Sequence, residues 1–210
     1  MGLDWNPLAR PRDDHEEEFI RLFRTLEDGG ADGDREKTLE RFRAISQPPF
    51  ELLGAPRVGF DAAADEWLRA SLEEAGKLDD LAEAQEAMKG YHVLDLLPPC
   101  DGFPIYTHYG HYDGLDRYSF RAKFLDDVEE VIGPELHERA YQRMLARELE
   151  EYGSQLMAAA RTFVASRGIA EPAEPSEDFG SDESRAHILF SAARWCLYWA
   201  ARGHGLDPWF

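Results

Sequence analysis

A short stretch of the chain gathers side chains that metal ions prefer. Cys100, His108, His111 and Asp113 lie close together in the sequence. Thiolate, imidazole and carboxylate groups are the donors that zinc and related ions accept. However, Gly110 and the alternating tyrosines indicate a turn, where a separation of three residues does not make side chains converge as it does on a helix. Hydrogen bonding within a loop is the simpler interpretation, so we expect no cofactor, and zinc is the ion to test.

The same segment is rich in tyrosine. Tyr106, Tyr109 and Tyr112 follow one another at spacings of three residues. A tyrosine side chain has an apolar ring and a polar hydroxyl, which suits ligand pockets and protein interfaces alike. We therefore treat these three residues as candidates for binding a partner. The alternative is that the rings pack the segment onto the helices.

Basic residues surround the expected start of a helix, for which Ser119 is the predicted N-cap. Arg117, Arg121 and Lys123 are unusual there, because the positive end of the helix dipole favours anions. A carboxylate or phosphate held by the backbone N–H groups and two guanidinium groups would remove the conflict, which makes Arg117 and Arg121 candidate anion-binding residues. The alternative, which the sequence favours, is pairing with nearby acids, namely Asp113, Asp116, Asp126 and Asp127.

The common signatures of enzymes are absent from the sequence. We find no Gly-rich phosphate loop, no Gly-x-Ser-x-Gly elbow, no Cys-x-x-Cys pair and no His-Glu-x-x-His helix. Cys100 with His92, His108 or His111 as a base would be a nucleophilic pair, but nothing in the sequence indicates an activated thiol. Cys196 lies in an amphipathic segment and is interpreted as a core residue.

Two pairs of adjacent acids raise the question of paired catalytic carboxylates or a di-metal site. They are Asp126–Asp127 and Glu129–Glu130. Neighbouring residues on a helix point to different sides of it, so these acids are typical of a solvated face.

Composition limits the class of partner. The chain has 210 residues, with 23 Lys and Arg against 42 Asp and Glu, a formal net charge of −19. Such a surface repels phosphate backbones, which excludes nucleic acid as an expected partner and leaves a basic protein or a small anion. Hydrophobic residues at 43% and aromatic residues at 12% are too abundant for a disordered acidic chain.

The sequence also indicates the compartment. The first twenty residues contain no unbroken apolar stretch, so a signal peptide is not expected. The most apolar run, residues 186–201, is interrupted by Arg194 and is shorter than the ~20 residues that a membrane span requires. Two widely separated cysteines do not resemble a disulfide framework. We expect a soluble cytoplasmic protein without a membrane partner.

Apolar residues recur at helical spacing over most of the chain. Helices are predicted at residues 13–28, 34–46, 79–89, 119–132, 135–167 and 182–202, with one more after the cap residue Asp61. Residues 91–97 and 103–109 are β-prone, and residues 169–183 form an acidic, Pro-containing stretch predicted to be a mobile loop.

These patterns predict a mainly α fold, a single domain over residues 1–210. We expect a bundle of about seven helices with a small β-hairpin or ordered Tyr-rich loop around residues 91–118. The function that the sequence favours is a non-enzymatic binding protein that engages a protein partner through its Tyr-rich segment. The alternative is a small metal- or anion-binding enzyme or ligand-binding protein with a pocket around residues 92–121.

Overall fold

The computed structural model describes residues 2–29, 35–97, 119–173, 176, 178 and 180–210. The described residues divide into two compact units: unit 1 contains those before residue 50 and those from residue 119 onward, and unit 2 contains residues 50–97. The protein is mainly α-helical, with two small antiparallel sheets of two strands each among the described residues, which confirms the predicted mainly α fold class. The single-domain organisation stays a prediction.

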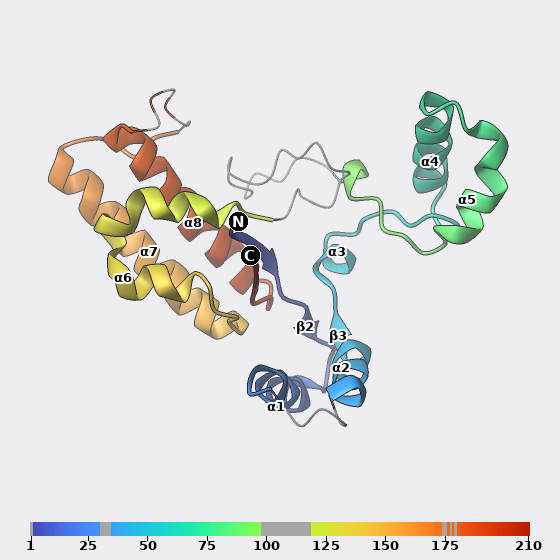
Figure 1. Ribbon diagram of the computed structural model, residues 1–210, viewed down its shortest axis with the longest axis horizontal. Helices are drawn as coiled ribbons and strands as arrows, with labels where there is room; N and C mark the ends of the chain where they lie inside the picture. Colours follow the sequence, from blue (N-terminus) through green and yellow to red (C-terminus); the bar gives the residue numbers. More distant parts are fainter. Residues whose placement is uncertain (1, 30–34, 98–118, 174–175, 177, 179) are drawn as a thin grey trace. The chain divides into compact units, whose positions relative to one another are not determined.

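Unit 1 contains the longest helices of the described chain (Figure 1). Its regular elements are β1 (Asp4–Pro7), β2 (Arg10–Pro11), α1 (Glu16–Glu27), α2 (Arg35–Ala44), β3 (Ser46–Gln47), the 3₁₀-helix η4 (Ala122–Val128), α6 (Glu129–Arg139), α7 (Ala146–Arg167), α8 (Asp182–Ala200) and β4 (Leu206–Trp209).

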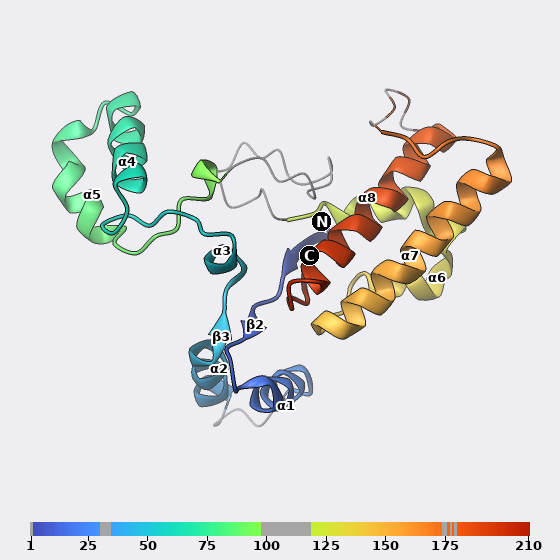
Figure 2. The same ribbon diagram turned by 180° about the vertical axis from the view of Figure 1, so that it is seen from behind.

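Helices α7 and α8 lie side by side and form the centre of unit 1 (Figures 1 and 2). Ser181 caps α8 by accepting a hydrogen bond of 3.1 Å from the backbone N–H of Ser184. The helix then buries most of its side chains, because neighbouring elements cover it on several sides. The two helices approach closely where Gly153 faces Cys196: a Cβ on Gly153 would lie 2.7 Å from the Cβ of Cys196.

Strand β1 completes this core from the N-terminal end of the chain. It pairs antiparallel with β4, so the two chain ends lie together (Figure 1). Trp5 of β1 is fully buried, and its ring centroid lies 5.5 Å from that of Trp195 and 5.8 Å from that of Tyr152. Its indole N–H donates a hydrogen bond of 2.8 Å to the carbonyl of Ala140, so the one polar atom of the ring is satisfied.

Helices α1 and α2 fall on the segments predicted to be helical, residues 13–28 and 34–46, and pack against each other. Phe19 of α1 and Phe42 of α2 pack with ring centroids 4.6 Å apart. Leu8, Phe23 and Ile45 are buried in the same cluster, and strands β2 and β3 pair antiparallel beside it. The apolar residues of the two helices thus face one shared cluster.

The helix predicted for residues 119–132 differs in its start. The chain enters η4 at Ala122, and Arg121, not Ser119, occupies the N-cap position. Ser119 is buried, and the next residue, Phe120, exchanges two backbone hydrogen bonds with Trp5. Pairing with strand β1 holds residue 120 in an extended conformation, which overrides the helical periodicity.

The long helix predicted for residues 135–167 is divided into α6 and α7. Met144 forms an isolated β-bridge with Leu206 of β4, exchanging hydrogen bonds of 3.0 and 2.8 Å. This pairing to a strand remote in sequence interrupts the helix. The predicted break at Gly133 and Pro134 is present, because Gly133 has a φ of 78° inside the span of α6. Only glycine adopts that conformation at little cost.

Unit 2 is a small helical unit with its own core. Its elements are α3 (Pro49–Leu52, which begins at the last residue of unit 1), α4 (Ala62–Glu74), η1 (Leu78–Asp80), α5 (Leu81–Ala87) and η2 (Leu94–Leu96). Val58, Ala64, Leu68 and Val93 form its cluster of buried apolar residues. The ring of Trp67 stacks on that of Tyr91 at 6.4 Å at the edge of this core.

The segment expected to form a hairpin or ordered loop is described only up to residue 97. His92 forms an isolated bridge with Arg57, and Leu94–Leu96 form the short 3₁₀-helix η2. Residues 98–118 lie outside the described residues, as do parts of the predicted loop at residues 169–183.

Candidate functional site

Most of the side chains that the sequence singled out fall outside the described residues. These are the proposed metal ligands Cys100, His108, His111 and Asp113, and the proposed binding residues Tyr106, Tyr109, Tyr112 and Arg117. Their roles stay predictions.

Arg121 is the candidate that the structure describes. Its Nε donates a hydrogen bond of 2.5 Å to a carboxylate oxygen of Asp4 in β1, and Asp4 is only 18% exposed. Lys123 bonds to Asp126 one turn along η4. Both cations therefore pair with carboxylates. The partner of Arg121, however, comes from the N-terminal strand β1 and not from the acids close to Arg121 in the sequence.

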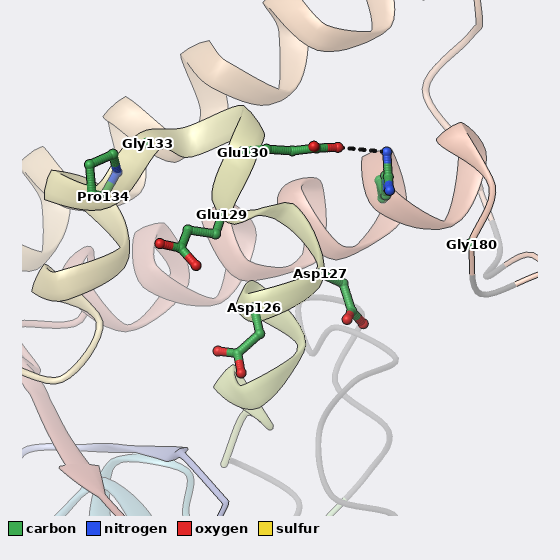
Figure 3. Close-up of a pocket in the computed structure, with 8 residues that line it drawn as sticks. Asp126, Asp127, Glu129, Glu130, Gly133, Pro134 and Gly180 are labelled. Carbon is green, nitrogen blue, oxygen red and sulfur yellow. Dashed lines mark hydrogen bonds and ion pairs between the residues drawn. The ribbon is translucent and has the colours of Figure 1, made fainter.

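The described residues of unit 1 border an acidic cleft beside η4 and α6. Its volume is about 680 Å³. The residues that line it are Asp126, Asp127, Glu129, Glu130, Gly133, Pro134, Gly180 and Arg185 (Figure 3). From the sequence, these four acids were expected to form a solvated face. The structure shows that all four border one hollow, whose lining contains one guanidinium, that of Arg185.

The junction of η4 and α6 positions these acids. Asp126 and Asp127 lie in the last turn of the 3₁₀-helix, and Glu129 and Glu130 open α6. Carboxylates in the first turn of an α-helix are stabilised by its dipole. The buried residues Leu125, Val128 and Ile132 anchor this segment to the core, so the polar residues between them face the solvent.

Asp126 is the carboxylate of the cleft with the most partners. It accepts hydrogen bonds from Lys123 and, at 3.0 Å, from Nε2 of His137. Burial acts to raise the pKa of Asp126, but these two hydrogen bonds outweigh it and lower the pKa below its ordinary value. Asp126 is therefore an anion at neutral pH whose charge is already balanced.

The remaining three acids differ in their partners. Glu130 receives a hydrogen bond of 2.8 Å from Arg185 of α8, drawn as a dashed line in Figure 3. The carboxylates of Asp127 and Glu129 are exposed and form no ion pair with any described residue. The cleft thus holds two carboxylates that form no ion pair with a cation of the described residues.

The carboxylates do not converge on one point. In Figure 3, Asp127 points away from Asp126 and Glu129, and Glu130 reaches in a further direction. Accordingly, the described residues contain no group of three or more His, Cys, Asp or Glu side chains placed to hold a metal ion. A hard cation needs several oxygen ligands at one position, whereas separate cationic side chains can each meet one splayed carboxylate.

Four other titratable side chains of unit 1, those of Cys196, Tyr152, His187 and His204, are buried. Burial raises the pKa of the Cys196 thiol and of the Tyr152 hydroxyl well above their ordinary values, so both stay protonated. Burial also lowers the pKa of His187 and takes that of His204 to about 4. Cys196 is fully buried, which confirms its interpretation as a core residue. None of these four groups lines the acidic cleft.

Comparison with protein-family models, with curated proteins and with solved structures yields no match. Among the described helices, none combines the length and the apolar character needed to cross a membrane. The function must therefore be argued from the site itself.

Proposed function

We propose that the protein is a non-enzymatic binding protein whose acidic cleft in unit 1 engages a basic segment of a partner protein. The observation that carries the proposal is the pair of exposed carboxylates, Asp127 and Glu129, that face a hollow of about 680 Å³ and form no ion pair with a described residue. An arginine or lysine side chain entering the cleft would supply that cation.

The direction of the carboxylates supports a protein partner over a single metal ion. Because the acids are splayed around the hollow, several cationic side chains spaced along a peptide fit them better than one ion. The formal net charge of −19 would also attract a basic partner over long range and speed its association. On sequence grounds, the Tyr-rich segment is included in the proposed interface.

A labelled peptide of alternating lysine and arginine tests the proposal by fluorescence anisotropy at low salt. The double variant Asp127→Asn with Glu129→Gln replaces both exposed carboxylates by amides of the same shape and so removes two negative charges. Since an exposed charge pair contributes up to about 1 kcal/mol, we expect Kd for the peptide to rise roughly three- to tenfold.

The matched control removes two charges elsewhere. Glu73→Gln with Glu74→Gln changes exposed acids of α4 in unit 2 and gives the same net charge. We expect this variant to bind the peptide as tightly as the native protein does, within a factor of about two. Equal weakening by the two double variants would show that the peptide responds to total charge and that the cleft is not the site.

The alternative function, a metal- or anion-binding enzyme or ligand-binding protein, depends on residues outside the described chain. Of its candidate binding residues, Arg121 is described, and it is bonded to Asp4. Elemental analysis of protein purified without a His tag tests the zinc site directly: stoichiometric zinc would support ligation by at least two of Cys100, His108, His111 and Asp113.

A further inference from the structure

In unit 1, His204 connects the segment that precedes β4 to the segment that follows β1. It lies in the turn between α8 and β4, and its side chain is fully buried. Its Nδ1 is 2.8 Å from the carbonyl oxygen of Leu8, just beyond β1, and the N–H of Leu8 donates to the carbonyl of Gly205 at 2.9 Å. Because a carbonyl only accepts hydrogen bonds, Nδ1 carries the proton and donates it to Leu8.

The other ring nitrogen has a different environment. Nε2 is buried and has no hydrogen-bond partner among the described residues. The imidazole stands perpendicular to the indole of Trp199, with ring centroids 5.4 Å apart. The neutral ring tolerates this position, because Nε2 then carries only a lone pair.

The charged groups that act on His204 are both cations. Arg10 of β2 donates to Gln47 at 2.8 Å, and Arg202 lies over the ring of Tyr198. The carboxylate nearest in sequence, that of Asp207, is bonded to Arg143 at 2.6 Å. The segment before α7 contributes the backbone of Met144 to this region, which is uncharged. Among the described residues, therefore, no carboxylate is in place to balance a positive charge on the ring.

We propose that His204 is an acid-sensitive latch, which holds the N-terminal segment at Leu8 while its imidazole is neutral and releases it when the imidazole is protonated. Protonation would add an N–H at Nε2 with no acceptor and place a buried charge beside two guanidinium groups. Rotation of the ring into solvent removes both penalties and breaks the hydrogen bond to Leu8. The contact between Leu8 and Gly205 then loses its support.

The pKa of His204 gives the direction of this effect. Burial, with the two arginines, lowers the pKa from 6.5 to about 4 in the closed state, against the opposing effect of the Leu8 carbonyl. A solvated imidazole binds its proton near pH 6.5, so the open state holds more protons between those values. The latch is fully closed above pH 6.5 and weakens as the pH falls towards 4. Between pH 7 and pH 5 the opening constant should rise about 20-fold.

Hydrogen exchange of the native protein, corrected for the intrinsic exchange rate at each pH, measures the opening. We expect the protection factor of the Leu8 amide to fall roughly 20-fold between pH 7 and pH 5. Amides in the middle of α7, between Leu149 and Phe163, should keep theirs. Parallel loss in both regions would mean that acid unfolds unit 1 as a whole, which would overturn the latch. This comparison needs no variant.

Two variants separate His204 from the other titrating groups. His204→Asn retains a donor near the position of Nδ1 but cannot titrate, so its Leu8 amide should show less than a threefold change over the same pH range. His187→Asn removes another buried imidazole and should respond like the native protein. Both variants keep all 42 acids, so protonation of the acids contributes equally to the measurements on the native protein and on the two variants. A 20-fold change that persists in His204→Asn would assign the opening to another group and end the proposal.

Discussion

The indole Nε1 of Trp5 and the backbone carbonyl of Ala140 are joined by a hydrogen bond of 2.8 Å across 135 residues of the chain. This bond fixes strand β1 to the end of α6, and the ring of Trp5 then packs against Trp195 of α8. One side chain from the N-terminal strand thus connects elements that are otherwise separated in sequence.

Replacement of Trp5 by phenylalanine should destabilise the protein. The variant leaves the Ala140 carbonyl without its indole donor inside the core, which costs about 1–3 kcal/mol of unfolding free energy, and the smaller ring adds to this. Urea unfolding followed by circular dichroism measures the change. Trp209→Phe is the control, because Trp209 is 74% exposed and its replacement should change stability by less than about 0.5 kcal/mol. Equal effects of the two replacements would contradict the role given to Trp5.

The sequence was sufficient for those elements whose structure depends on local pattern. Apolar residues at helical spacing predicted α1 and α2, and Ser181 stands immediately before the predicted start of α8. The break at Gly133 followed from the same local rules. Each of these features is determined by residues within a few turns of one another.

The errors arose where distant backbone segments pair. Phe120 bonds to Trp5, and Met144 bonds to Leu206, so helices predicted to run through these regions begin late or are interrupted. Periodicity carries no information about such partners. The acidic cleft was missed for a related reason: adjacent acids at the η4–α6 junction do point apart, but the kinked backbone arranges them around a common hollow.

The close approach of α7 and α8 predicts that Gly153→Ala is destabilising, although alanine is the better helix former by roughly 0.5–1 kcal/mol. The added methyl would lie 2.7 Å from the Cβ of Cys196 and 3.3 Å from the carbonyl oxygen of Ala193. Overpacking of this kind costs about 1–3 kcal/mol. Thermal unfolding should show a lower Tm for Gly153→Ala.

The matching double variant tests the cause of that loss. Removing the opposing Cβ with Cys196→Gly should make the pair less destabilised than the sum of the two single changes. Gly180→Ala serves as the control, because its nearest neighbour, an oxygen of Asp178, is 3.5 Å away and its φ is not positive. Additive effects of Gly153→Ala and Cys196→Gly would show that the two positions do not clash.

Cys196 should resist alkylation in the native protein. Its side chain is fully buried, and burial raises the pKa of the thiol well above its ordinary value, so the reactive thiolate is scarce even at pH 8. We expect iodoacetamide to label Cys196 only after denaturation. Peptide mapping by mass spectrometry identifies the modified cysteine, and a Cys196 labelled as fast in native buffer as in urea would contradict its burial.

The ion pair between Arg121 and Asp4 makes the last prediction, because it decides between structural pairing and the anion site that the sequence suggested. A double-mutant cycle with Arg121→Gln and Asp4→Asn should give a coupling of about 1 kcal/mol, since Asp4 is only 18% exposed. Arg147 and Glu151, which are 90% and 60% exposed, form the control pair and should couple by less than about 0.5 kcal/mol. If Arg121 acts through Asp4, the difference in Tm between sodium sulfate and sodium chloride at equal ionic strength should be the same in the native protein and in Arg121→Gln. Screening of a chain with a formal net charge of −19 and the general stabilising effect of sulfate act on both proteins alike. A larger rise in sulfate that disappears in Arg121→Gln would instead show that this guanidinium binds anions.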